Sequence, residues 1–289
     1  MKAAFLGLGV MGGPMAGHLA VRGGDLTVYN RTAAKADAFT RANKARRAAS
    51  PAEAASGADI VIACLGDDPD VEAVLGEVLP AAKRGALVVD HSTTSPDLAR
   101  RLATAFAGKG AAFIDAPVSG GEAGARAGKL SVMCGGDGAA VERARPVLEA
   151  YSVRIVHVGP SGHGQLCKAV NQICIAGLLQ GLAEGVHFAA TAGLDIDRVL
   201  EAVSGGAARS WQMENRAKTM AEGSFDFGFA VDWMRKDLRI ALAEARRSGA
   251  QLPVAALVDQ FYSEIQAMGG GRQDTSSLIR RLKRPVNRA

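Results

Sequence analysis

The sequence predicts an α/β protein in which an N-terminal, doubly wound parallel sheet domain is followed by an all-α C-terminal domain. Short apolar segments with the length of buried strands alternate with helical segments through the first half of the chain. A glycine-rich loop follows the first of these strands at once. After Val158 the pattern is almost wholly helical, so we place the domain boundary near Gly159-Pro160, between residues 1–160 and 161–289.

The individual elements follow from apolar runs and from helical spacing. The predicted strands of the first domain cover residues 2–6, 26–29, 60–65, 86–90 and 112–115. The first helix is predicted to end near Arg22, and later ones cover 33–42, 71–79 and 96–109. In the second domain, helices are predicted over 165–192, 195–204, 231–248 and 253–268.

The composition is that of an ordinary globular protein. Of 289 residues, 48% are apolar and 22% are charged. No segment reaches about 18 uninterrupted apolar residues, so no membrane span is expected. The glycine loop begins too early for a signal peptide, and the four cysteines lack metal-ligand spacing. We therefore expect reduced thiols, no metal site and a cytoplasmic protein.

The charge balance is basic, but the basic residues are dispersed. A net charge of +5 suits an anionic cofactor and acid substrates, and it does not by itself indicate nucleic acid. The densest basic run extends from Arg280 to Arg284. We expect that run to be a solvated tail or a subunit contact.

The glycine loop Gly7-Leu8-Gly9-Val10-Met11-Gly12 lies between a strand and a helix, as in dinucleotide-binding Rossmann domains. Gly7 permits the tight turn, Gly9 allows the backbone to approach a pyrophosphate, and Gly12 allows close helix packing. The N–H groups and the dipole of the following helix favour phosphate. The alternative is a glycine-rich turn without a ligand.

The end of the second strand bears on which nucleotide binds. NAD enzymes usually place an acidic residue there for the ribose diol, and this chain has Asn30-Arg31-Thr32 instead. No carboxylate repels a 2′-phosphate, and Arg31 and Thr32 can pair with one. The sequence therefore predicts NADP, with use of either cofactor as the alternative.

Two further loops follow strands of the same predicted sheet, at the edge where such folds bind ligands. Thr93, in the hydroxyl-rich loop after Asp90, is a candidate cofactor contact, or the loop only caps the next helix. Ser119, Gly120 and Gly121 leave backbone N–H groups uncovered, as a concavity for a substrate carboxylate requires. A structural turn is the alternative for these three residues.

Lys168 is the candidate general acid/base, because a lysine seldom lies in an apolar helical seam without a partner or a reaction. Asn171 follows one turn later on the same helix face and can orient the amine and the substrate oxygen. Burial and a positively charged nicotinamide favour the neutral amine. A structural lysine with an ion-pair partner is the alternative.

A charged pair interrupts the apolar stripe of residues 233–242. Asp237 lies inside the stripe and Lys236 borders it. We expect these two side chains at a domain or cofactor contact.

Six segments in order, GLGVMGGPMA, YNRT, STTSP, DAPVSGG, GHGQLCKAVNQ and MRKDLRIAL, resemble the β-hydroxyacid dehydrogenase family over nearly the whole chain. That family includes 3-hydroxyisobutyrate dehydrogenases and glyoxylate/succinic semialdehyde reductases. The resemblance implies a Rossmann domain, a helical domain, and homodimers or homotetramers through the helical part. It also implies that a short hydroxy acid and its semialdehyde are interconverted (the 3-hydroxyisobutyrate, 4-hydroxybutyrate or glycolate class).

The resemblance assigns roles to the candidate residues. It gives Lys168 the catalytic lysine position and Asn171 the asparagine after it, and it matches Ser119, Gly120 and Gly121 to the carboxylate-binding segment. YNRT most resembles the NADPH-using semialdehyde reductases. The predicted cofactor contacts are Gly7, Gly9, Val10, Met11, Gly12, Asn30, Arg31, Thr32, Leu65, Thr93 and Lys236.

Three rivals share this architecture. Imine reductases generally carry another residue type at the lysine position. A non-catalytic NADP-binding interaction protein is expected to have lost Lys168, which this chain keeps. A 6-phosphogluconate dehydrogenase has a much longer helical region.

Overall fold

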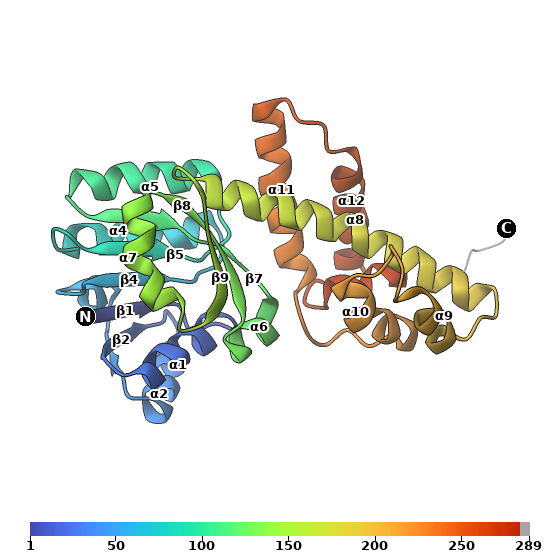
Figure 1. Ribbon diagram of the computed structural model, residues 1–289, viewed down its shortest axis with the longest axis horizontal. Helices are drawn as coiled ribbons and strands as arrows, with labels where there is room; N and C mark the ends of the chain where they lie inside the picture. Colours follow the sequence, from blue (N-terminus) through green and yellow to red (C-terminus); the bar gives the residue numbers. More distant parts are fainter. Residues whose placement is uncertain (284–289) are drawn as a thin grey trace. The chain divides into compact units, whose positions relative to one another are not determined.

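The computed structural model describes residues 1–283 of the chain. The chain forms two compact units, Met1–Lys168 and Ala169–Ala289 (Figure 1). The first contains a sheet with helices and the second is helical, so the predicted fold class is confirmed. The boundary expected between residues 160 and 161 stays a prediction, because one helix, α8 (His163–Thr191), belongs partly to each unit.

One sheet holds the nine named strands of the described residues, in the order β3-β2-β1-β4-β5-β6-β8-β7 with β9 beside β8. The strands are β1 (Lys2–Leu6), β2 (Asp25–Tyr29), β3 (Arg46–Arg47), β4 (Ile60–Ala63), β5 (Leu87–Asp90), β6 (Ala112–Asp115), β7 (Val118–Ser119), β8 (Leu130–Gly136) and β9 (Ser152–Gly159). Strands β1 to β6 are mutually parallel, whereas β8 runs antiparallel to β6 and β7. The sheet is therefore mostly parallel rather than wholly so.

The register brings the carboxyl ends of five strands into one row. The paired residues are Tyr29, Leu6, Ala63, Asp90 and Asp115. The chain order reverses between β1 and β4, which is the point where doubly wound sheets bind ligands. The residues that follow these five strand ends therefore meet at one edge.

Seven helices cover the two faces of the sheet. They are α1 (Gly12–Arg22), α2 (Ala33–Ala42), α3 (Pro51–Ala55), α4 (Asp68–Ala81), α5 (Pro96–Gly108), α6 (Gly121–Ala127) and α7 (Gly138–Leu148). Because successive strand side chains point to opposite faces, Phe5 packs into the core with α1 and α7, whereas Ala4 and Leu6 pack into the core with α4 and α5. Burial on both faces explains why the strands are continuous apolar runs.

The second unit is built around α8 and its own apolar core. It contains α9 (Ile196–Val203), α10 (Trp211–Glu222), α11 (Val231–Ser248), α12 (Pro253–Ala267) and a 3₁₀-helix, η1 (Thr275–Arg281). The core residues that α8 contributes are Ala176, Leu179, Ala183 and Val186. Helix α10 is absent from the sequence prediction because it buries only Met213, Ala217 and Met220 on an otherwise polar surface.

Helix α8 is long and apolar enough to cross a membrane by length and composition, with a mean hydropathy of 1.4 over its best window. It contains no uninterrupted apolar run, since glycines, glutamines and Lys168 interrupt it. A core helix meets the same criterion, and α8 supplies part of the core of the second unit.

The basic run near the C-terminus makes contacts within the chain. The guanidinium of Arg280 donates to Gln273 Oε1 at 2.6 Å. Arg281 pairs with Glu264 at 3.0 Å and lies 3.6 Å from the ring centroid of Phe261. The expectation of a solvated tail is therefore wrong for these two arginines, while Arg284 lies outside the described residues.

Candidate active site

The three motif glycines of the β1–α1 loop have different surroundings. Gly7 has φ +98°, and a Cβ on it would collide with the carbonyl oxygen of Cys64. A Cβ on Gly12 would collide with the carbonyl oxygen of Gly7, whereas a Cβ on Gly9 would meet no atom within 4 Å. Gly7 and Gly12 are thus required by packing, and Gly9 faces open space.

Helix α1 begins in a way that suits an anion. Its N-cap residue, Met11, makes no side-chain cap hydrogen bond, and its first turn holds no acidic residue. Val10 is 63% exposed at the same turn. Unmasked N–H groups, a positive helix dipole and the open side of Gly9 fit a pyrophosphate.

The residues after β2 divide their work. Asn30 is structural in part, because its Oδ1 accepts from the N–H of Leu8 at 2.9 Å and its Nδ2 donates to the carbonyl of Thr32 at 3.0 Å. Asn30 thereby fixes the glycine loop against the end of β2. The side chain of Arg31 is 84% exposed and pairs with Asp70 at 2.8 Å, an exposed ion pair of little strength.

The loops after β4 and β5 are joined to each other. The N–H of Leu65 donates to Ser92 Oγ at 2.8 Å, and Leu65 lies against Gly7. Thr93 is half-buried beside the buried Ser92 and Thr94. The predicted cofactor residues of the first unit therefore all follow strand ends at the same edge of the sheet.

Ser119, Gly120 and Gly121 form the turn between β7 and α6. Gly120 has φ +129° and Gly121 has φ +59°, so both occupy backbone conformations that favour glycine. Both glycines are exposed, and Ser119 is half-buried. Because a Cβ on Gly121 would meet nothing within 4 Å, the backbone of this turn is open to a ligand.

Lys168 lies in the second turn of α8 and is buried, with 8% of its surface exposed. It belongs to the first unit, together with the glycine loop and Thr93. Asn171, one turn later, is the first predicted site residue of the second unit. Its Nδ2 donates to Gln172 Oε1 at 2.7 Å.

Asn171 is the end of a polar chain inside the second unit. Gln172 is buried and its Nε2 donates to Asp237 Oδ2 at 2.6 Å. The other oxygen of Asp237 lies 3.1 Å from Lys236 Nζ. Asp237 is 3% exposed, so its place within an apolar stripe is confirmed. The sequence analysis missed Gln172, although it directly follows Asn171 in the quoted motif.

Lys236 also lines a basic groove of about 450 Å³ on α11 and α12. Its ammonium is 5.7 Å from the ring centroid of Trp233. The remaining lining residues are Asp232, Arg235, Arg239, Leu242, Ala243, Arg246 and Asp259. An excess of cationic side chains makes this face suited to an anionic ligand.

His91 follows β5 but points into the core. Its Nδ1 donates to the carbonyl of Ala116 at 2.6 Å, so its Nε2 accepts from the hydroxyl of Tyr151 at 2.8 Å. Burial lowers the pKa of His91 to about 4. The imidazole is therefore neutral and structural at pH 7.

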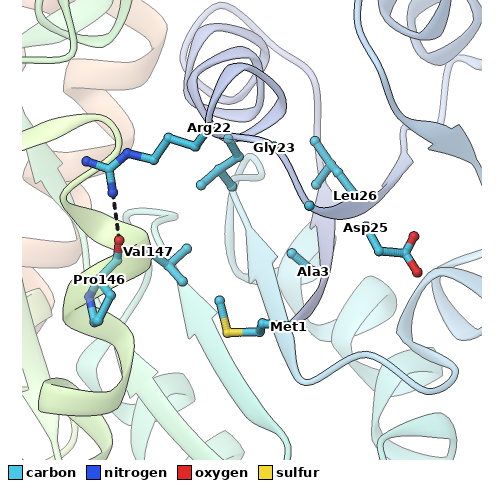
Figure 2. A pocket seen from close by; sticks show the side chains of 10 residues that line it. Met1, Ala3, Arg22, Gly23, Asp25, Leu26, Pro146 and Val147 are labelled. Atoms are coloured by element: carbon cyan, nitrogen blue, oxygen red, sulfur yellow. Dashed lines mark hydrogen bonds between the residues drawn. The ribbon is translucent and has the colours of Figure 1, made fainter.

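A small pocket of about 120 Å³ lies at the opposite edge of the sheet, among the starts of β1 and β2 and the ends of α1 and α7 (Figure 2). Arg22 crosses it and donates to the carbonyl of Pro146 at 2.8 Å. None of the predicted site residues lines this pocket. The candidate site is instead the carboxyl edge of the sheet.

Comparisons with known proteins agree with this architecture. Residues 2–159 match a family model described as the NAD binding domain of 6-phosphogluconate dehydrogenase, and residues 162–282 match one described as NAD-binding of NADP-dependent 3-hydroxyisobutyrate dehydrogenase. The chain is 59% identical to an uncharacterized oxidoreductase of Shewanella frigidimarina over 98% of both chains. It is 38% identical to 2-hydroxy-3-oxopropionate reductase of Escherichia coli over 99% of both chains.

A solved structure gives the same result. The structure of Mycobacterium tuberculosis 3-hydroxyisobutyrate dehydrogenase with L-serine is 31% identical and has a TM-score of 0.90, covering 98% of this chain and 99% of that one. This chain belongs to the β-hydroxyacid dehydrogenase family. As a β-hydroxyacid dehydrogenase it is an oxidoreductase with NADP or NAD as its cofactor, which confirms the predicted family and cofactor class.

Proposed function

We propose that this β-hydroxyacid dehydrogenase prefers NADP and interconverts a short hydroxy acid with its semialdehyde, with Lys168 as general acid/base. The observation that carries the proposal is the buried position of Lys168. It lies in the same unit as the glycine loop, on a helix whose first turn is bonded to the carboxyl ends of the sheet.

The proton chemistry follows from an amine held away from bulk water. The bound dinucleotide supplies the hydride in reduction and accepts it in oxidation. In reduction, the ammonium of Lys168 donates a proton to the carbonyl oxygen of the substrate. In oxidation, the neutral amine takes the proton of the hydroxyl.

Other residues bind and orient the substrate in this proposal. Ser119 and the exposed backbone of Gly120 and Gly121 suit a carboxylate, since they offer a hydroxyl and N–H groups without covering side chains. Asn171 orients the reacting oxygen, and its amide is itself held by Gln172. Lys236 contacts the cofactor from the basic face of the second unit.

The NADP preference rests on the residues after β2. No carboxylate follows that strand, since Asn30 occupies the position and bonds to the glycine loop. Arg31 is bound only by an exposed pair with Asp70, which a 2′-phosphate can replace at little cost. Thr32 adds a hydroxyl next to it.

We also propose a homodimer or homotetramer assembled through the second unit. Val170 and Phe188 of α8 are 60% and 69% exposed, and Leu178 between them is 39% exposed. Gly181 and Gly185 have no atom within 4 Å of an added Cβ. These residues share one face of α8, opposite its buried side, and a second copy of the chain would cover it.

The decisive experiment is a panel assayed by NADPH absorbance with the wild type and Lys168→Ala. The panel contains glyoxylate, succinic semialdehyde, 2-hydroxy-3-oxopropionate, 3-hydroxyisobutyrate and L-serine, with cyclic imines included. We expect at least one acid to turn over and Lys168→Ala to lose roughly 10²- to 10⁴-fold in kcat. Turnover of imines alone would replace this proposal with an imine reductase. NADPH binding without any turnover would indicate a non-catalytic interaction protein.

The same panel, run with NADH, tests the cofactor preference. Arg31→Ala should weaken NADPH binding by roughly tenfold or more and leave NADH binding unchanged, because a charge-assisted hydrogen bond contributes about 1.5–3 kcal/mol. Arg41→Ala, at the last turn of α2, is the matched control. A wild type that prefers NADH would contradict the NADP assignment.

A further inference from the structure

The first turn of α8 is bonded to the end of β6 by Asp115. The Oδ1 of Asp115 accepts from the N–H of Gly162 at 2.7 Å, and its Oδ2 accepts from the N–H of Gln165 at 3.0 Å. The N–H of Gly164 also bonds to this carboxylate. Asp115 is fully buried, so a single carboxylate satisfies the start of the helix in the interior of the first unit.

The same turn is bonded to the loop after β5 by Gln165. Its Oε1 accepts from the N–H of Thr94 at 3.1 Å, and its Nε2 donates to the carbonyl of Ser92 at 2.8 Å. Gln165 is 1% exposed. These two bonds flank Thr93, the proposed cofactor contact, and Gln165 lies three residues before Lys168.

The backbones at this crossing leave no space for movement. A Cβ on Gly135 of β8 would lie 2.7 Å from both Asp115 Oδ1 and the nitrogen of Gly164. A Cβ on Gly164 would lie 2.6 Å from the carbonyl oxygen of Asp115. The helix start is thus fixed by five hydrogen bonds from two side chains and by contact of backbone on backbone.

A buried carboxylate is a costly way to cap a helix. Burial raises the pKa of Asp115, and bonds from three backbone N–H groups oppose that rise. Helix α7 of the same unit is capped by Asp137, which is exposed. The difference between the two caps is the residue that follows: only α8 presents a proposed acid/base one turn later.

We propose that Asp115 and Gln165 are positioning residues that fix Lys168 relative to the Ser92–Thr94 loop and so to the reacting atoms. This proposal rests on the proposed function, in which Lys168 transfers the proton. A misplacement of about 1 Å at such a group can cost about 100-fold in rate.

The test uses Asp115→Asn and Gln165→Met in the full-length protein. Each is close in volume to the native side chain and removes bonds to the first turn of α8. The matched controls are Asp137→Asn, another aspartate cap of the first unit, and Gln180→Met. Gln180 lies on the same helix and bonds only within it, to Glu184 at 2.7 Å.

Three measurements separate positioning from mere stability. Hydrogen exchange of the cofactor-free protein should speed up at residues 164–168 in both test variants and in neither control. With the panel acid that the wild type reduces fastest, kcat should fall roughly 10- to 100-fold. KM and the Kd of NADPH should stay within about twofold. The isotope effect with 4-deuterated NADPH should rise, since a misaligned hydride step limits turnover.

The outcomes distinguish this inference from the proposed function. Full activity of Lys168→Ala would overturn the acid/base assignment itself. An inactive Lys168→Ala, combined with test variants that match their controls in exchange and isotope effect, would overturn the positioning role alone. Should Asp115→Asn fail to fold, Gln165→Met carries the same test because it keeps the carboxylate.

Discussion

His91 shows how a titratable side chain can serve the fold while standing next to a reactive edge. It is buried between the carbonyl of Ala116 and the hydroxyl of Tyr151, and its pKa falls to about 4 from 6.5. Between these values the unfolded chain binds a proton that the folded chain does not. Stability from His91 is therefore fully present above pH 6.5 and is lost as the pH falls towards 4.

We predict that His91→Gln removes this pH dependence. The difference in free energy of unfolding between wild type and His91→Gln should narrow by about 3 kcal/mol between pH 7 and pH 4, at about 1.4 kcal/mol for each pH unit. Urea denaturation at each pH measures it, and Asp115 cancels because both proteins contain it. Tyr151→Phe, which keeps the imidazole, should retain the wild-type slope. A constant difference would mean that His91 titrates normally.

Single residues also mark where sequence reasoning stops. The motif predicts Asn30 as a nucleotide contact, yet the bond from Leu8 to Asn30 gives it a second role in shaping the glycine loop. Asp115, Gln165 and Gln172 were missed as supports of the site, although each lies in a quoted motif. Their bonds join residues far apart in sequence, so no spacing rule could reveal them.

The β1–α1 loop carries a prediction about two glycines with different surroundings. Gly9→Ala should leave the melting temperature nearly unchanged and weaken NADPH binding by roughly tenfold, about 1.4 kcal/mol, because its Cβ enters the open side of the loop. Gly12→Ala should instead destabilise the fold by about 1–3 kcal/mol, since its Cβ meets the backbone of Gly7.

Thermal melting and fluorescence titration of NADPH measure both effects. Gly17→Ala is the control, because Gly17 lies on the same helix and its Cβ would meet nothing. Unchanged NADPH affinity in Gly9→Ala would argue against a pyrophosphate at this loop.

The helices and strands were predictable where the pattern is periodic and apolar. The first five predicted strands match β1, β2, β4, β5 and β6 to within a few residues. Strand β9 escaped because most of its side chains are exposed, and α10 because few of its residues are buried. The caps of α10, Ser210 and Gly223, were the usable signal.

The assembly of the protein carries the last prediction. Light scattering coupled to gel filtration should show a dimer or tetramer for the wild type. Phe188→Glu combined with Leu178→Glu should shift it to a smaller species, because charges on the apolar face of α8 oppose its burial. A monomeric wild type would contradict the proposed assembly.

The control for this experiment is Val21→Glu. Val21 is 86% exposed and lies on α1, in the first unit, so the charge should leave the oligomeric state unchanged. An equal shift in this control would indicate a general loss of stability.

The continuity of α8 has a mechanical consequence. Lys168 is tied through the first turn to the sheet, while Asn171 is tied through Gln172 and Asp237 to the helical bundle. The amine and the amide thus answer to separate halves of the molecule, and an unbroken run of peptide hydrogen bonds acts as the rigid axle between them. Nothing short of melting that turn can pull the proton donor away from its neighbour.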